Sequence, residues 1–255
     1  MPEGDTLFRA ARTLHQALAG RTVLRFESVF PHLARIDTDT PIRGRAIEGV
    51  GARGKHLLIR FSGDLVLRTH LRMHGSWHLY RPGERWRRPF RDMRIVIGTD
   101  AFEAVAFNVP EAEFVDAEGL PRAAALENLG PDPLAADFDA DEAVRRIQRR
   151  HDTPIADALL DQGAMAGIGN IFKSETLFAA RISPFTLVRD LTREQVVKVV
   201  KTGAALLRAD RPAAFRVYGR AGRPCPRCGT PISRQTQGPH ARSTYWCEGC
   251  QPGVT

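Results

Sequence analysis

All four cysteines of this 255-residue chain lie in two CxxC motifs, CPRC and CEGC, close to its C-terminus. Residues 229–246 separate the two motifs, and this spacing is typical of zinc ribbons. Two CxxC pairs can place four thiolates about 2.3 Å from one Zn²⁺ in a tetrahedron. We expect a structural ion, because four protein ligands leave no open position for a reacting group. The expected ligands are Cys225, Cys228, Cys247 and Cys250.

Disulfide bonds are the alternative use of these cysteines. The N-terminal segment is acidic and lacks an apolar core, so it does not look like a signal peptide. The sequence also lacks an apolar run of about eighteen residues, the length that could cross a membrane. We therefore expect a cytoplasmic protein that has no membrane partner and whose thiols stay reduced.

The stretch between the CxxC motifs, TPISRQTQGPHARSTYW, predicts a β-hairpin with basic residues near its tip. A rigid hairpin that carries arginine can contact a phosphate backbone, although many zinc ribbons bind proteins instead. The formal net charge is +8, which favours a polyanionic partner such as nucleic acid. Charge and ribbon together indicate nucleic-acid binding without establishing it.

The pattern of the remaining sequence changes near residue 128. Residues 5–19 show apolar residues at helical spacing, and short β-rich runs with turn signals continue to about residue 115. A turn-rich segment, NLGPDPLAADFD, then precedes four helical patterns, at residues 141–150, 153–162, 170–181 and 192–209. These patterns predict an α+β fold: an N-terminal helix with an antiparallel β-sandwich, a helical domain and a zinc hairpin. The expected domains are 1–127, 128–215 and 216–255.

A glycine-rich stretch, GAMAGIGN, connects two of the helical patterns and ends at Asn170. Glycines let a backbone approach a ligand closely, and the N–H groups that begin a helix can face an anion. The Asn170 amide could itself donate a hydrogen bond to a phosphate. An ordinary connection with an asparagine N-cap explains these residues equally well.

The chain begins MPEGDT, with Pro2 and Glu3 at its tip. Most termini fray and have no function, so these residues gain meaning only from the rest of the chain. Seven motifs occur in order: PEGDT, RGKHLLIRF, THLRMHGSW, LGPDPL, GIGNIFKSETLFAARISP, VYGRAGRPCPRCGTPI and ARSTYWCEGCQ. Together, over residues 2–251, they resemble the formamidopyrimidine-DNA glycosylase / endonuclease VIII family. The PEGD opening is more similar to the endonuclease VIII branch.

The resemblance implies a bifunctional DNA glycosylase and abasic-site lyase of base excision repair. In this family the initiator methionine is removed and the exposed proline is the nucleophile, which gives that role to Pro2. An α-amino group has a pKa near 8 whereas lysine has one near 10, so part of the terminal amine is neutral at physiological pH. Pro2 would attack the sugar, expel the base and form an iminium, while Glu3 would transfer protons. β-Elimination, with or without δ-elimination, would then cut the strand.

Further residues acquire roles from the same resemblance. Lys55, in the catalytic cleft, would contact the phosphate beside the lesion and support the lyase steps. Asn170 would bind a phosphate, and Arg242 of the zinc hairpin would hold the lesion phosphate at the catalytic centre. Met73 matches a methionine that enters the duplex when a base is flipped out. Glu175 would brace the N-terminal strand and turn region.

The lesion is less well specified than the chemistry. The formamidopyrimidine branch also fills the void with an Arg and a Phe in a segment like DPRRFG, whereas this chain reads FNVPEAEFVD there. We therefore expect damaged DNA with oxidised pyrimidines as substrate, and single-stranded or bubble DNA needs less filling. Oxidised purines such as 8-oxoguanine are the nearest alternative, and a non-catalytic DNA-binding zinc-ribbon protein is another. The family further implies a monomer associated with the bacterial nucleoid.

Two other motifs stand out. RWRRPFRD, residues 85–92, is basic and aromatic but lies outside the position of the missing Arg–Phe pair. His70, His74 and His78 follow one another at intervals of four and would share one face of a strand. They have no carboxylate partner in the pattern, so imidazoles along a DNA-facing strand explain them better than a metal site does.

Overall fold

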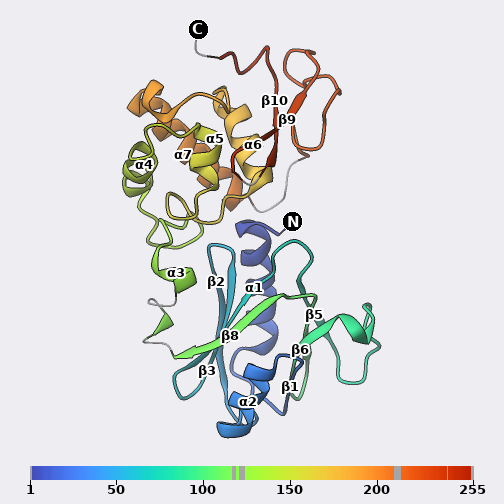
Figure 1. The fold of residues 1–255 in the computed structure, drawn as a ribbon. Helices are drawn as coiled ribbons and strands as arrows, with labels where there is room; N and C mark the ends of the chain where they lie inside the picture. The colour runs from blue at the N-terminus through green and yellow to red at the C-terminus, as the bar shows by residue number, and fades with distance from the viewer. Residues whose placement is uncertain (1, 117–118, 121–123, 210–213, 240, 254–255) are drawn as a thin grey trace. The chain divides into compact units, whose positions relative to one another are not determined.

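The structure is a computed structural model that describes residues 2–116, 119–120, 124–209, 214–239 and 241–253. The chain forms two compact units, residues 1–127 and 128–255. The first combines helices with antiparallel sheets, and the second combines helices with a C-terminal hairpin (Figure 1). The α+β class expected from the sequence is therefore confirmed.

Helix α1, Gly4–Leu18, opens the first unit. Its apolar side faces the core, as the helical spacing predicts, and it packs along strand β2, Ile47–Arg53 (Figure 1). The Val50 N–H donates to Nδ1 of His15 at 3.1 Å, which ties this strand to the helix. The buried side chains of the helix are Leu7, Ala11, Leu14, Ala17 and Leu18, beside Gly4 and Asp5 at its start.

Two antiparallel four-stranded sheets form the rest of this unit. One has the order β2-β3-β4-β8 and the other β1-β6-β7-β5. The large apolar core contains side chains from both sheets and from α1, which is the sandwich expected from the β-rich runs. The strands are β1 Arg25–Ser28, β2 Ile47–Arg53, β3 His56–Phe61, β4 Leu65–His70, β5 Ser76–Tyr80, β6 Met93–Gly98, β7 Glu103–Phe107 and β8 Glu111–Asp116.

The sequence did not indicate helix α2, Pro31–Asp39. The β-rich run that precedes this helix forms only the short strand β1, and the helix begins at Pro31. Proline is well tolerated there because the first helical N–H has no partner within the helix. Two further short helices, η1 Phe90–Asp92 and α3 Ala124–Glu127, belong to the same unit.

In the second unit, helices enclose their own apolar core. Thr192 and Gln195 form a capping box at the start of α7, and Asp139 caps α4. The hairpin β9–β10 packs on α6 through a small cluster that includes two cysteines (Figure 1). The elements are α4 Ala140–Gln148, α5 Ile155–Leu160, α6 Asn170–Ala180, η3 Val188–Asp190, α7 Arg193–Arg208, β9 Ser233–Gln237 and β10 Arg242–Trp246. Among the described residues, every helix is too short or too polar to reach across a bilayer.

Candidate active site and zinc centre

Pro2 and Glu3 immediately precede helix α1. Glu3 is the N-cap residue, and its carbonyl accepts hydrogen bonds from the N–H groups of Thr6 and Leu7 at 3.0 and 3.1 Å. The Glu3 side chain is buried and Pro2 is half-buried. The start of the chain is thus anchored by a fifteen-residue helix. The positive end of that helix favours a carboxylate here.

Lys55 lies at the tip of the β2–β3 hairpin. Arg53 pairs with His56 across the turn, which leaves only Gly54 and Lys55 between the strands. Gly54 has φ +57, and a two-residue turn with positive φ at its first position favours glycine there. Lys55 is half-buried. The turn therefore presents this lysine at the end of a rigid ribbon.

A buried polar cluster lies directly behind Lys55. His56 pairs with His70 of β4, and their ring centroids are 4.7 Å apart. Arg68 contacts Nδ1 of His56 at 2.8 Å and donates to Glu113 at 2.6 Å. Burial, the neighbouring His70 and nearby cations lower the pKa of His56 to about 3. No local sequence motif marks His56 and Arg68, because their role depends on the pairing of β3 with β4.

His70 shares this neutral character. Burial is the main cause that lowers its pKa to about 4, and the Glu111 carboxylate opposes that shift. Both imidazoles are thus uncharged at neutral pH. The positive charge near Lys55 therefore comes from lysine and arginine side chains and not from histidine.

Met73 lies in the β4–β5 turn at the same end of the first sheet as Lys55, because His56 and His70 are paired. Its side chain is 50% exposed. Arg72 adopts φ +50 and donates to Glu111 at 2.6 Å. Arg72 and Arg68 thus neutralise Glu111 and Glu113, the carboxylates of the stretch that the sequence analysis compared with an Arg–Phe loop.

Asn170 is the first residue of α6 and contacts the zinc hairpin. Its Nδ2 donates to the Ser243 carbonyl at 2.7 Å, while its buried Oδ1 has no hydrogen-bond partner. Arg242, the neighbour of Ser243, begins β10 and is exposed. The structure thus brings Asn170 close to Arg242, as two residues proposed to bind phosphate require. A cavity of about 560 Å³ lies beside Arg242 and includes Arg150, Asp157 and Gln237 in its lining.

Lys173 is a functional candidate that the sequence analysis missed. It lies one turn after Asn170 on α6 and is completely buried. Its Nζ donates to Oγ1 of Thr244 at 2.9 Å and to the Ser243 carbonyl at 3.3 Å. Burial raises the pKa of Asp157, and the charge of Lys173 opposes that rise. A lysine among apolar residues of a helix was the only sequence signal.

Glu175 braces a different segment from the one expected. Its carboxylate accepts hydrogen bonds from the N–H groups of Arg216, Val217 and Tyr218 at 2.9, 3.0 and 2.8 Å. These residues lead into the zinc ribbon, so the expectation of a brace for the N-terminal region was wrong. Three successive backbone donors are an apt environment for a carboxylate.

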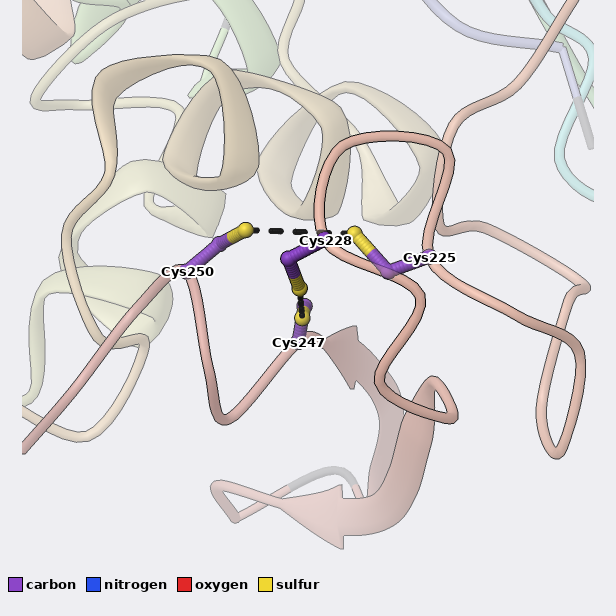
Figure 2. A group of neighbouring side chains, drawn as sticks. All are labelled: Cys225, Cys228, Cys247 and Cys250. Atoms are coloured by element: carbon purple, nitrogen blue, oxygen red, sulfur yellow. Dashed lines mark hydrogen bonds between the residues drawn. The ribbon is translucent and has the colours of Figure 1, made fainter.

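The four cysteines converge as the spacing predicts (Figure 2). All four Sγ atoms lie within 4.8 Å of one another, with Cys225–Cys250 at 3.9 Å and Cys228–Cys247 at 3.4 Å. A tetrahedron with Zn–S distances of 2.3 Å requires sulfurs about 3.8 Å apart, so this donor set fits Zn²⁺. Gly229 adopts φ +80 directly after the first pair. The cysteines form a structural zinc site.

The three histidines do not form a second metal site. His70 ends β4 and His78 lies in β5, which belongs to the other sheet. His78 contacts Ser76 and Tyr80 at 3.0 Å each. Over the residues that the structure describes, the cysteines are the only group of three or more possible ligands.

Comparison with known proteins agrees with this architecture. The N-terminal domain of formamidopyrimidine-DNA glycosylase matches residues 1–118, its H2TH domain matches 129–210, and a zinc finger found in FPG and IleRS matches 222–253. The chain belongs to the formamidopyrimidine-DNA glycosylase / endonuclease VIII family.

Within that family the chain belongs to the endonuclease VIII-like branch. It is 39% identical to "Probable endonuclease 8 2" of Streptomyces coelicolor, over 99% of this chain and 95% of that protein. It is 36% identical to "DNA-(apurinic or apyrimidinic site) lyase Nei2" of Mycolicibacterium smegmatis, over 98% and 99%. The Lactococcus lactis formamidopyrimidine-DNA glycosylase, solved with DNA containing an AP site, has the same fold. Its TM-score is 0.86 at 22% identity, over 98% and 99% of the two chains.

Proposed function

We propose that this protein is a bifunctional DNA glycosylase and abasic-site lyase of base excision repair that removes oxidised pyrimidines from damaged DNA. The observation that carries the proposal is the pair Pro2–Glu3 fixed at the N-terminus of α1. It occurs in a chain of the family whose relatives are named for endonuclease VIII and AP lyase activity.

Removal of Met1 gives Pro2 a secondary amine. Its nitrogen forms a bond to the sugar C1′ while the bond from C1′ to the damaged base breaks, and the base leaves with a proton. Glu3 helps to open the sugar ring and carries protons between steps. The resulting iminium acidifies C2′, loss of that proton breaks the C3′–O bond, and water finally releases Pro2. The buried position of Glu3 beside the nucleophile supports this role.

Lys55 is proposed to hold the phosphate beside the lesion. Its place at the tip of a two-residue turn supports this, because a short hairpin limits its range of positions. A cation there would also stabilise the phosphate that departs in the elimination step.

Asn170 and Arg242 of the second unit are proposed to bind phosphate, and Arg242 to hold the phosphate at the lesion. The proximity of these two residues supports the proposal, since the Asn170 amide bonds to the residue after Arg242. One N–H of that amide is engaged by the Ser243 carbonyl, and an amide nitrogen has two.

Met73 is proposed to enter the space left by the flipped nucleotide. An exposed apolar side chain on a turn at the Lys55 end of the sheet suits that role. The stretch that corresponds to the Arg–Phe segment of the formamidopyrimidine branch contains Glu111 and Glu113 instead. This difference favours DNA substrates in which the space left by the flipped base needs less filling. Oxidised purines and a non-catalytic DNA-binding role are the competing possibilities.

The zinc site serves this function structurally, by fixing the hairpin that carries Arg242. We propose three functional segments: a catalytic domain at 1–127, a DNA-binding helical domain at 128–215 and a zinc hairpin at 216–255. The active form is proposed to be a monomer at the nucleoid in the bacterial cytoplasm. The relatives from Streptomyces coelicolor and Mycolicibacterium smegmatis support a bacterial setting.

Borohydride trapping tests the proposal. Protein shown by mass spectrometry to lack Met1 is mixed with an oligonucleotide containing an abasic site, and borohydride is added. We expect a covalent complex attached at Pro2, and no complex with Pro2→Gly. Glu3→Gln should trap abasic DNA but excise no base, and Arg43→Ala, an exposed change elsewhere in the same unit, should behave as wild type.

Trapping at Lys55 would assign the nucleophile to another amine. Absence of any complex, with measurable DNA binding, would leave a non-catalytic DNA-binding protein. Excision of 8-oxoguanine in preference to oxidised pyrimidines would correct the substrate class.

A further inference from the structure

The segment that connects β5 to β6 has no role in the proposed chemistry. It contains the RWRRPFRD motif, and its two aromatic rings stack on each other. The ring centroids of Trp86 and Phe90 are 5.8 Å apart with an angle of 5° between the planes. Phe90 is 70% exposed, more than any other large apolar side chain described as exposed. An exposed aromatic ring held parallel to a second ring requires an explanation.

The stacked pair is anchored to the sheet beneath it. The Trp86 Nε1–H donates to Glu103 at 2.7 Å, and the Trp86 ring meets the Phe107 ring edge-on at 5.7 Å. The Arg87 N–H donates to the Tyr80 hydroxyl at 3.1 Å. These contacts fix Trp86 on the sheet, and the Trp86 ring in turn stacks on one face of the Phe90 ring. We call Trp86, Phe90 and the four arginines of the same segment, Arg85, Arg87, Arg88 and Arg91, the 85–91 platform.

The charges of the platform are not compensated. Elsewhere in the first unit arginines commonly face carboxylates, as Arg68 and Arg72 do. By contrast, the platform arginines are all exposed, and the described part of the chain gives none of them an ion pair. Burial and the nearby Arg88 and Arg87 lower the pKa of His78, which packs edge-on against Phe107.

Strand register gives the position of the platform within the unit. Phe107 pairs with Ser76 of β5 and with Met93 of β6. Ser76 begins β5 directly after the turn that carries Met73. Trp86 contacts Phe107 at the Ser76 end of β7 and Glu103 at the opposite end, so the platform extends along this strand.

We propose that the 85–91 platform is a second DNA-binding surface that takes single-stranded DNA, with an unpaired base stacked on Phe90 and the flanking phosphates held by the four arginines. Aromatic stacking combined with a basic surface is the general means of binding single strands without sequence preference. A base inside a duplex has no free face for such stacking. An acidic peptide would use the arginines but would leave the stacked, exposed ring without a function. This inference goes beyond the proposed function, since the platform contains none of the proposed reacting groups.

The test measures binding of the full-length protein to a fluorescein-labelled oligothymidylate by fluorescence anisotropy at several salt concentrations. Loss of one base stack should weaken binding of Phe90→Ala by about fivefold or more, while Phe90→Trp should retain wild-type affinity. Arg88→Ala should weaken binding and lower the salt slope by about one. Arg43→Ala, an exposed arginine in the α2–β2 connection, is the charge-matched control and should change the affinity by less than twofold.

The same variants are assayed for cleavage of a short abasic-site duplex. Phe90→Ala should cleave it at the wild-type rate, because stacking of an unpaired base is not needed there. Circular dichroism and zinc content confirm that each variant is folded.

Several results would overturn the proposal. Equal affinity of Phe90→Ala and wild type would exclude stacking, even if Arg88→Ala binds more weakly. Binding of polyglutamate that depends on Phe90, without an effect on oligothymidylate, would identify a protein-binding surface instead. Binding of oligothymidylate that depends on Phe90, in a protein that forms no borohydride complex, would retain the platform and refute only the catalytic proposal.

Discussion

At the scale of single residues, the sequence identified the groups proposed to react but not those that support them. Pro2, Glu3 and Lys55 follow from local motifs, and a motif can be found in a sequence without knowing the fold. The roles of His56 and Arg68 depend on partners on neighbouring strands. The two residues contact each other although they are twelve residues apart in the sequence. No local pattern encodes such a contact.

The buried histidines make stability depend on pH. Burial holds the pKa of His56 at about 3 and that of His70 at about 4, whereas both are near 6.5 in the unfolded chain. Below pH 6.5 the unfolded chain therefore binds more protons than the folded protein, so stability falls as the pH falls from 6.5 towards 4. At pH 5 this linkage costs roughly 1–2 kcal/mol for each histidine.

Urea unfolding at pH 7.5 and pH 5 measures this loss in the wild type and in His56→Gln, which should lose about 1–2 kcal/mol less. His15→Gln is the control, because His15 lies on α1 outside the cluster and its imidazole accepts a hydrogen bond from the Val50 N–H of β2. An equal loss in His56→Gln and the wild type would show that His56 does not titrate as the geometry implies.

Lys173 is expected to position the zinc hairpin. In Lys173→Met the side-chain volume is kept, but the bonds to Thr244 and to the Ser243 carbonyl are lost. Unsatisfied buried groups should lower the free energy of unfolding by about 1–3 kcal/mol. The weaker hold on β10 should also reduce affinity for abasic-site DNA, because Arg242 begins that strand.

Affinity and zinc content measured together separate positioning from general damage. Lys173→Met should keep one zinc ion and lose affinity for DNA, and Lys173→Arg should recover part of that affinity. Wild-type affinity in a destabilised Lys173→Met protein would show that the lysine contributes only to folding.

At the scale of elements, one helix organises most of the second unit. On α6, Asn170 and Lys173 hold β10, while Glu175 holds the segment that leads into the ribbon. The helical pattern of residues 170–181 predicted this element to within one residue of its end. Its partners could not be predicted, because they lie about forty to seventy residues later and most of the bonds go to backbone atoms, which carry no sequence signature.

The first unit shows where sequence patterns succeed and where they fail. Short β-rich runs separated by turn signals predicted the sandwich, and the burial of β3, β4, β6 and β7 on both faces explains why these runs are apolar rather than alternating. Helix α2 was missed because only Leu33 is fully buried in its nine residues, which leaves almost no apolar stripe. The three histidines were expected on one strand, but His70 and His78 lie in different sheets and His74 lies in the turn between them.

At the scale of the whole molecule, the described residues form four apolar clusters with separate memberships. A large and a small one lie within residues 1–127, a large one lies within the helices of 128–255, and a small one joins the end of α6 to the ribbon. Cys225 and Cys247 belong to this last cluster, so the metal and this packing depend on each other. The two large clusters contain none of the four cysteines. Loss of zinc should therefore unfold the ribbon and leave most of the protein intact.

Removal of the metal tests this division. A chelator should release one zinc ion per chain, abolish borohydride trapping on abasic-site DNA and leave most of the helical circular dichroism unchanged, because α1 and α4–α7 pack in the large clusters. Cys247→Ser should give the same result without chelator, since Cys247 is fully buried and its replacement leaves three thiolates. Added Zn²⁺ should restore trapping in the chelated wild type but not in this variant. Trapping that persists without zinc would mean that the ribbon, and Arg242 with it, is dispensable for lesion binding. Loss of the helical signal of α4–α7, with that of α1 and α2 retained, would mean that the zinc site supports the entire second unit.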